Sequence, residues 1–366
     1  MVIFIEELKD QPKALKETFQ YYEDPNQGGQ ILNTVRQIMK KSAFHHIIYT
    51  GMGSSFFNSI IASNYLSSKG ISVDVRDTGE FFDFSRFNTN KSPTEIIVGV
   101  SQSGESGELV KLIQKMKEEG FNFDNFWGIT NTAESTLGKA SRIRLLTKGG
   151  TETSVTSKTY TTGLLVHLML ARAICDEDPI SPEIKTQTFN LIENLKGKIE
   201  SETGEFWKLA KEIDTHLGNY SFINFIGHGT SMATVLQSAL NIKELAKIYA
   251  EGITVGMFRH GPIEIIDPNF RGIILINDLT SAKIFKPVIQ NIIEKWGQGK
   301  IVVITNQPAE LSGISSNNLM VCINPIQNPY LAPIYDMILL QPYLCLKTEQ
   351  HGFIPGEFRN TQKITK

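Results

Sequence analysis

The segment SQSGES at residues 101–106 gathers hydroxyl and amide groups that could hold an anion: Ser101, Gln102, Ser103 and Ser106. It follows the apolar run 96–100, which is rich in β-branched residues, as a buried strand would be. Apolar residues then recur at helical spacing over 109–116. Because a helix N-terminus offers free N–H groups and a favourable dipole, this segment favours anion binding. The alternative is an ordinary turn in which Ser103 caps the helix.

A second glycine-serine turn, GMGSS at 51–55, places Ser54 and Ser55 between another apolar run and another apolar-periodic helix. In a parallel sheet both loops would lie at the carboxyl ends of strands, where open α/β folds bind ligands. The two loops together therefore strengthen the prediction of an anion site. A dinucleotide is not expected, because GMGSSF lacks the third glycine of the GxGxxG pattern and the loop holds no Arg or Lys.

Glu244 is the carboxylate whose position most favours proton transfer. On a helix over 232–249, four-residue spacing would place it on one apolar stripe with Leu236, Leu240 and Ile248. Desolvation there would raise its pKa unless a cation compensates, which suits proton transfer near neutral pH. A glutamate paired for structural reasons is the alternative.

Two further candidates stand in loop-like sequence. His260 lies in RHGP at 259–262, and histidine is the natural proton shuttle near neutral pH, although a surface histidine is the alternative. Lys363 lies in the tail GEFRNTQKITK at 356–366, which composition alone would assign to a frayed chain end.

The elements that would position these groups follow a repeating order. Strand-type runs alternate with helical segments over residues 45–130, which predicts a parallel, doubly wound α/β sheet. The pattern then recurs: SFINFIGHGTSMATVLQSAL (221–240) has the layout of HHIIYTGMGSSFFNSIIASN (45–64), and KIVVITN (300–306) matches NFWGITN (125–131). The nearly constant spacing between partners predicts two copies of one α/β unit.

The two copies are not chemically equal. Where the first has SQSGES, the second has NDLTSA at 277–282, which predicts a single ligand site in the first copy. We expect a helical arm at 1–29, a first domain at 30–178, a charged helical linker at 179–218, a second domain at 219–350 and a tail at 351–366.

Composition narrows the class of protein. The 366 residues are 41% hydrophobic and 20% charged, which is ordinary for a soluble globular protein of two domains. The net charge of -2 argues against nucleic acid as a partner. No apolar run suits a membrane span and the start resembles no secretory signal, so we expect no membrane partner and a cytoplasmic location. The three cysteines fit a reduced compartment, and no Cys/His cluster has metal-ligand spacing, so we expect no metal or other cofactor.

In combination, GMGSS, SQSGES, the KEL…AEG…FRHGP run and the RNTQK tail resemble the double sugar isomerase (SIS) family. The likeness extends along nearly the whole chain. It is nearest to the isomerase half of glucosamine-6-phosphate synthase and to related amino-sugar-phosphate deaminases and deglycases. The resemblance implies two flavodoxin-like SIS subdomains, each a parallel sheet flanked by helices, in a homodimer that binds a phosphosugar.

The resemblance also implies a role for each candidate residue. The phosphate would be held by Ser55, Ser101, Gln102, Ser103 and Ser106, with Ser54 and the Val155 backbone nearby. Glu244 falls on the family's proton-transferring carboxylate, and His260 on a ring-opening histidine that reaches the site from the neighbouring subunit. Lys363 falls on a tail lysine that can form a Schiff base with the keto sugar, and Arg359 on the arginine before it.

Three departures from the synthase bear on the substrate. No glutaminase domain is recognised and no Cys stands near the start, so we expect that this chain cannot draw ammonia from glutamine on its own. Asn241 occupies a position where the synthase has a lysine. The loop TETSVTSKTYTT at 151–162 is one residue shorter than its counterpart, which would reshape the pocket around Val155.

These features predict an isomerase or deaminase that interconverts a glucosamine-6-phosphate-like compound and fructose 6-phosphate with free ammonia. One alternative is a deglycase that splits a fructose-amino-acid 6-phosphate into a sugar phosphate and an amino acid. Another is a non-catalytic phosphosugar sensor, against which stand the three candidate catalytic residues and the lack of a recognisable DNA-binding segment.

Overall fold

The computed structural model describes residues 2–41, 44, 46–87, 95–296, 299–360 and 362–363. The chain divides into two compact units. The serine-loop unit comprises residues 13–188 and 359–366, and the second-copy unit comprises residues 1–12 and 189–358. The division falls inside the expected linker 179–218, and the tail after Phe358 belongs to the serine-loop unit.

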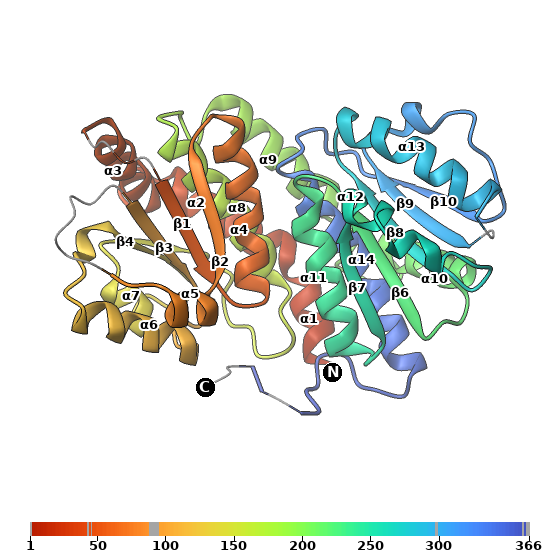
Figure 1. Cartoon of the computed structure of the whole chain (residues 1–366), viewed down its shortest axis with the longest axis horizontal. Helices are drawn as coiled ribbons and strands as arrows, with labels where there is room; N and C mark the ends of the chain where they lie inside the picture. Colours follow the sequence, from red (N-terminus) through yellow and green to blue (C-terminus); the bar gives the residue numbers. More distant parts are fainter. Residues whose placement is uncertain are drawn as a thin grey trace. The chain divides into compact units, whose positions relative to one another are not determined.

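The serine-loop unit is built on a five-stranded parallel sheet (Figure 1). Its strands are β1 (His46–Gly51), β2 (Ser72–Asp77), β3 (Glu95–Val100), β4 (Phe126–Thr130) and β5 (Ile143–Leu146). They lie in the order β2-β1-β3-β4-β5, which is the flavodoxin-like order. The central strands are buried on both faces, which explains why their sequences are continuous apolar runs.

Helices cover both faces of this sheet. The helices are α2 (Gln11–Glu23), α3 (Gly28–Lys41), α4 (Ser54–Ser68), α5 (Thr78–Phe84), α6 (Gly107–Glu118), α7 (Thr136–Ala140), α8 (Lys158–Ile174) and α9 (Pro182–Leu195). Helices α2 and α9 each cross the division between the two units. The unit also contains the short 3-10 turn Phe123–Asn125. Helices α5, α6 and α7 pack on one face, where α6 buries the apolar stripe predicted over 109–116. Burial of each of the four apolar side chains of this stripe stabilises the fold by roughly 1.5–3 kcal/mol. They are Leu109, Leu112, Ile113 and Met116.

Helix α8 pairs with α4 and is buried along its length, apart from Arg172. The apolar run 163–174 is therefore part of a buried core helix. Among the described residues, no helix has the length and apolar character needed to span a bilayer.

The second-copy unit repeats the same topology. Its strands are β6 (Phe222–Gly227), β7 (Tyr249–Thr254), β8 (Arg271–Ile276), β9 (Lys300–Thr305) and β10 (Leu319–Ile323), all parallel, in the order β10-β9-β8-β6-β7. Its helices are α1 (Ile3–Lys9), α10 (Glu205–Leu217), α11 (Ser231–Leu245), α12 (Val255–Arg259), α13 (Leu279–Glu294) and α14 (Ala332–Gln350), with 3-10 turns at Pro262–Ile265 and Pro308–Leu311. If β6 is equated with β1 and the rest follow in chain order, the two strand orders are identical. The predicted duplication of one α/β unit is therefore confirmed.

An equivalent backbone hydrogen bond in each unit identifies corresponding residues of the two copies. The first residue after β5, Thr147, donates its N–H to Thr130 O at 3.0 Å, and the first residue after β10, Asn324, donates to Thr305 O at 2.8 Å. Thr147 and Asn324 therefore occupy equivalent places at the carboxyl edges of their sheets, where ligands bind in this fold.

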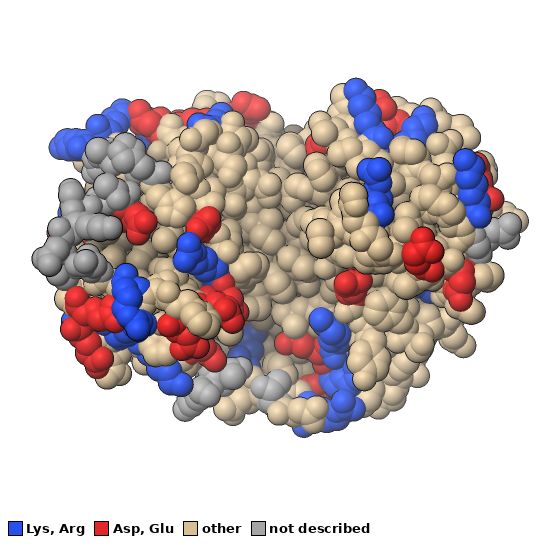
Figure 2. All heavy atoms as spheres, in the orientation of Figure 1, with Lys and Arg blue, Asp and Glu red and all other residues tan. Residues whose placement is uncertain are grey.

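Charged side chains are interspersed on the face of the molecule shown in Figure 2. Lys and Arg alternate with Asp and Glu there, and no large patch of one sign is visible. Such a face offers no track for a polyanion.

Candidate functional site

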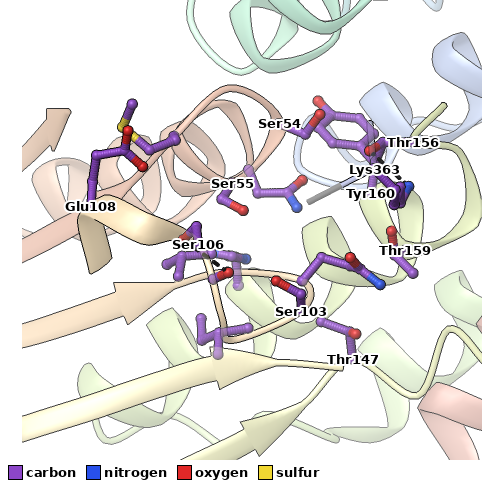
Figure 3. A pocket seen from close by; sticks show the side chains of 17 residues that line it. Ser54, Ser55, Ser103, Ser106, Glu108, Thr147, Thr156, Thr159, Tyr160 and Lys363 are labelled. Atoms are coloured by element: carbon purple, nitrogen blue, oxygen red, sulfur yellow. Dashed lines mark hydrogen bonds between the residues drawn. The ribbon is translucent and has the colours of Figure 1, made fainter. Parts of the chain in front are cut away.

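The two glycine-serine loops converge on one pocket of the serine-loop unit. The pocket has a volume of about 220 Å³ and lies at the carboxyl ends of β1, β3 and β5. Figure 3 shows Ser54 and Ser55 approaching it from the start of α4, and Ser103 and Ser106 from the loop before α6. The predicted residues that line it are Ser54, Ser55, Ser101, Gln102, Ser103, Ser106 and Lys363.

The serine loop does not form the capped turn that was the alternative to anion binding. The N-cap of α6 is Ser106, not Ser103, and its side chain makes no capping hydrogen bond. Ser106 Oγ instead donates to Ser101 Oγ at 3.3 Å, within the pocket lining. Gly104 has φ +68° and a Cβ there would stand 2.0 Å from Ser135 Oγ, so the loop requires glycine. The hydroxyls of the loop are therefore held toward the pocket rather than used to cap the helix.

The GMGSS turn enters α4 through Gly53, whose backbone has φ 50° and ψ -123°. Only glycine adopts this conformation at low cost. No side chain caps the start of α4. Ser54 and Ser55 of its first turn line the same cavity as the serine loop. The pocket is thus bordered by the starts of two helices of 12 and 15 residues, whose dipoles both favour an anion.

The C-terminal tail brings a cation to this pocket. Lys363 Nζ lies 2.7 Å from Glu152 Oε2 and 3.3 Å from Thr156 Oγ1, and its side chain is 18% exposed. Lys363 therefore lies at the pocket, whereas composition alone would have assigned it to a frayed end. Thr361 of the RNTQK segment and residues 364–366 lie outside the described residues.

Two of the residues predicted to bind the phosphosugar, Val155 and Arg359, are not part of the lining. Val155 is 1% exposed in the loop before α8, and Arg359 is exposed at the start of the tail. Neither lines the pocket, although Thr156, next to Val155, does.

Sequence reasoning overlooked Glu152, a fully buried carboxylate in the loop between β5 and α8. Burial by itself would raise the pKa of Glu152, but Lys363 and hydrogen bonds from Thr159 hold it below its usual value. The clue in the sequence was a glutamate set among the hydroxyls of TETSVTSKT, which no spacing rule singles out.

His167 is a second residue that the sequence did not single out. It lies on α8, lines the pocket and is fully buried, and burial lowers its pKa to about 4. Its Nδ1 lies 2.7 Å from Gly163 O, so this nitrogen carries the proton and Nε2 is the acceptor. His167 is therefore a neutral imidazole at neutral pH, and it cannot serve as a cationic phosphate ligand.

Glu244 and His260 both belong to the second-copy unit, whereas every residue that lines the pocket comes from the serine-loop unit. Glu244 is half-buried in the last turn of α11. The predicted stripe is wrong at its end, because α11 stops at Leu245 and Ile248 lies beyond it. His260 is exposed just after α12, as its loop-like sequence predicted. Asn241 is fully buried and accepts a 2.6 Å hydrogen bond from Gln237.

Comparison with known proteins gives a consistent result. Residues 42–172 match the SIS domain model. The chain is 30% identical over 345 residues to glutamine–fructose-6-phosphate aminotransferase (isomerizing) of Wigglesworthia glossinidia brevipalpis, covering 92% of this chain and 53% of that protein. The chain thus spans about half the length of this relative.

Solved structures with a similar fold cover nearly the whole chain. The C-terminal domain of glucosamine-fructose-6-phosphate aminotransferase from Francisella tularensis superposes with a TM-score of 0.78 at 21% identity, over 96% of each chain. Glucosamine-6-phosphate deaminase from Thermotoga maritima superposes with a TM-score of 0.68 at 17% identity, over 98% of this chain and 99% of that chain. At these identities the similarity establishes the fold.

Proposed function

Because this chain belongs to the SIS domain family through residues 42–172, we propose that its serine-loop pocket binds the phosphate of a sugar phosphate and that the protein is an enzyme acting on it. The reaction proposed is that of an isomerase or deaminase of an amino-sugar phosphate, of the glucosamine-6-phosphate and fructose-6-phosphate type. The observation that carries the proposal is the convergence of two hydroxyl-bearing helix starts and the tail lysine on one pocket.

The phosphate would lie between the starts of α4 and α6. Ser55, Ser101, Ser103 and Ser106 supply hydroxyl donors there, and backbone N–H groups of the first helical turns supply more. Holding the phosphate away from the reacting carbons lets its binding energy position the sugar. Gln102, which also lines the pocket, adds an amide donor.

The reacting end of the sugar would meet three groups. Glu244 moves a proton between C1 and C2 of the open-chain sugar, and His260, supplied by the partner subunit of a homodimer, opens the ring. Lys363 adds as a neutral amine to the keto carbon, and loss of water gives an iminium that acidifies the adjacent C–H. Val155 and Arg359 would support the bound sugar and the tail.

The proposal is tested with sugar phosphates and three readouts. The protein is incubated with glucosamine 6-phosphate, with fructose 6-phosphate and ammonium, and with a fructose-amino-acid 6-phosphate, and ammonia, free amino acid and sugar isomers are measured. Ammonia release or uptake supports the deaminase reaction. Release of amino acid alone identifies a deglycase, and binding without turnover of any of them identifies a sensor; both results contradict the proposal.

A further inference from the structure

A buried carboxylate, Glu152, joins the C-terminal tail to the first turn of α8. The loop between β5 and α8 carries it, and its side chain is 0% exposed. Four hydrogen bonds reach it from Ser157 and Thr159, at the start of that helix. The fifth comes from Lys363 Nζ, 211 positions further along the chain, at 2.7 Å. Glu152 therefore connects two segments that are remote in sequence.

The two carboxylate oxygens of Glu152 have different partners. Oε1 accepts the N–H and hydroxyl of Ser157 and the N–H of Thr159. Oε2 accepts the Thr159 hydroxyl and the Lys363 ammonium. The start of α8 accounts for all three bonds to Oε1 and for the Thr159 hydroxyl on Oε2, and a neutral amide oxygen could accept the bonds to Oε1 equally well. The second bond to Oε2 and the negative charge are explained by Lys363.

The ammonium group of Lys363 compensates the buried negative charge of Glu152. An isolated buried carboxylate is costly, and it is tolerated where a cation and hydrogen bonds compensate it. With its pKa held below the usual value, Glu152 stays ionised at neutral pH and forms an ion pair with Lys363. The other titratable groups that line the pocket are Glu108 on α6 and Tyr160 and His167 on α8, and Lys158 at the start of α8 approaches Gly150 of the same loop.

We propose that Glu152 is a positioning residue, which fixes Lys363 beside the phosphosugar pocket. The inference rests on the proposed function, because iminium formation is the step that requires Lys363. For that step the ammonium must leave Glu152 and release one proton to solvent. The amine then forms a C–N bond to the keto carbon, and the former carbonyl oxygen takes one proton from the amine nitrogen and one from solvent and departs as water, which leaves the iminium.

The pairing is tested without any sugar, by competitive acetylation of lysines with acetic anhydride and peptide mapping of the intact protein. Lys363 should react several-fold more slowly than the exposed Lys16 in the unaltered protein. Glu152→Gln keeps the acceptor for α8 and removes the charge, so Lys363 loses its ion-pair partner and should react several-fold faster. Equal reactivity of Lys363 and Lys16 in the unaltered protein would overturn the proposal whether or not the variant folds.

A second ion pair of the same unit provides the matched control. Lys69 Nζ lies 2.6 Å from Glu177 Oε1. Glu177→Gln should accelerate acetylation of Lys69 and leave Lys363 unchanged. A rise at Lys363 in this variant would show a general loosening of the unit and would contradict a specific role for Glu152.

The positioning role is then tested by borohydride trapping with fructose 6-phosphate, read as the mass added to the peptide that carries Lys363. Glu152→Gln should reduce trapping at least several-fold, shift its pH dependence to lower pH, and be partly rescued by Glu152→Asp. Trapping equal to that of the unaltered protein would reject the positioning role. If acetylation changes as expected but the unaltered protein traps and turns over no sugar phosphate, the ion pair stands and the proposed function fails.

Discussion

Asn277 donates a 2.7 Å hydrogen bond through Nδ2 to the fully buried carboxylate of Asp336. Asn277 is the first residue after β8, which makes it the equivalent of Ser101 after β3. The other oxygen of Asp336 accepts a 2.7 Å bond from Asn324, the equivalent of Thr147. In the second copy a carboxylate of the chain itself thus contacts the two positions that line the pocket in the first. At these positions of the second copy the chain's own acid stands where an anion would bind, which supports the prediction of a single anion site in the first copy.

Asp336→Asn should change the pH dependence of stability. Burial raises the pKa of Asp336 to about 7 in the folded protein, against the usual 3.8 of an aspartate carboxyl group. The folded state therefore binds the proton more tightly than the unfolded chain, and this contribution to stability is complete below about pH 4 and is lost as pH rises through about 7. The variant should remove that loss, which is a few kcal/mol by the usual conversion of pKa shifts. Denaturant unfolding at pH 5 and pH 8 measures it.

The structure also provides the rearrangement that Asp336→Asn requires. Asn277 Oδ1 is buried and, among the described residues, has no hydrogen-bond partner, so rotation of its amide can accept from the new side chain. If the variant is less stable than the unaltered protein at pH 8 by as much as at pH 5, Asp336 is not protonated more readily in the folded state.

Ser103→Ala should weaken phosphosugar binding while the fold is retained. The Ser103 hydroxyl lines the pocket, and within the chain it accepts a 3.1 Å bond from the Glu105 N–H. Loss of one donor should cost roughly 0.5–1.5 kcal/mol of binding free energy, or up to about 3 if the hydroxyl meets a full charge. Calorimetric titration with fructose 6-phosphate measures the change. A structure that shows the anion at residues 277–282 instead would contradict the assignment of the site.

The sequence predicted most of this scaffold for identifiable reasons. Apolar β-branched runs indicate the strands of both buried sheets. The repeat of GMGSS as GHGTS indicates which residues of the two copies correspond. The order of the strands and the packing of α4 against α8 are set by tertiary contacts, which no local pattern encodes.

Residues of the site were harder to predict where their role depends on a remote partner. Ser54, Ser55 and the serine loop are recognisable because helix starts concentrate hydroxyls. Glu152 is not, because its significance comes from Lys363, which is remote in sequence. The stripe assigned to Glu244 failed at Ile248 because helical periodicity does not reveal where a helix ends.

Glu244→Gln should abolish most turnover and spare binding. The change keeps the shape of the half-buried side chain and removes its capacity to take a proton. Turnover should fall by roughly a hundred-fold or more, with the affinity for fructose 6-phosphate little changed. The comparison of steady-state rates with calorimetric affinity separates the two effects. Near-normal turnover would assign Glu244 a structural role.

The last prediction concerns which subunit of the proposed dimer supplies Lys363 and which supplies His260 to one site. Removing residues 357–366 should end turnover while both sheets remain folded, because no strand or helix lies among the residues of this segment that the structure describes. Far-UV circular dichroism and thermal unfolding establish that the fold is retained. Since Lys363 lines the pocket of its own chain, whereas His260 is proposed to come from the partner subunit, each site would need two subunits.

A mixed dimer separates these contributions. When a His260→Ala chain is combined with a Lys363→Ala chain, one of the two sites carries both lesions and the other carries neither. Each parent alone should be inactive, and in the mixed dimer about half of the normal activity should return, as the twofold symmetry of a dimer requires. The mixture is made by co-expression with two affinity tags, so that only mixed dimers are assayed. If both parents dimerise and the mixed dimer stays inactive, His260 acts in the same chain as Lys363, and the proposed shared site is rejected.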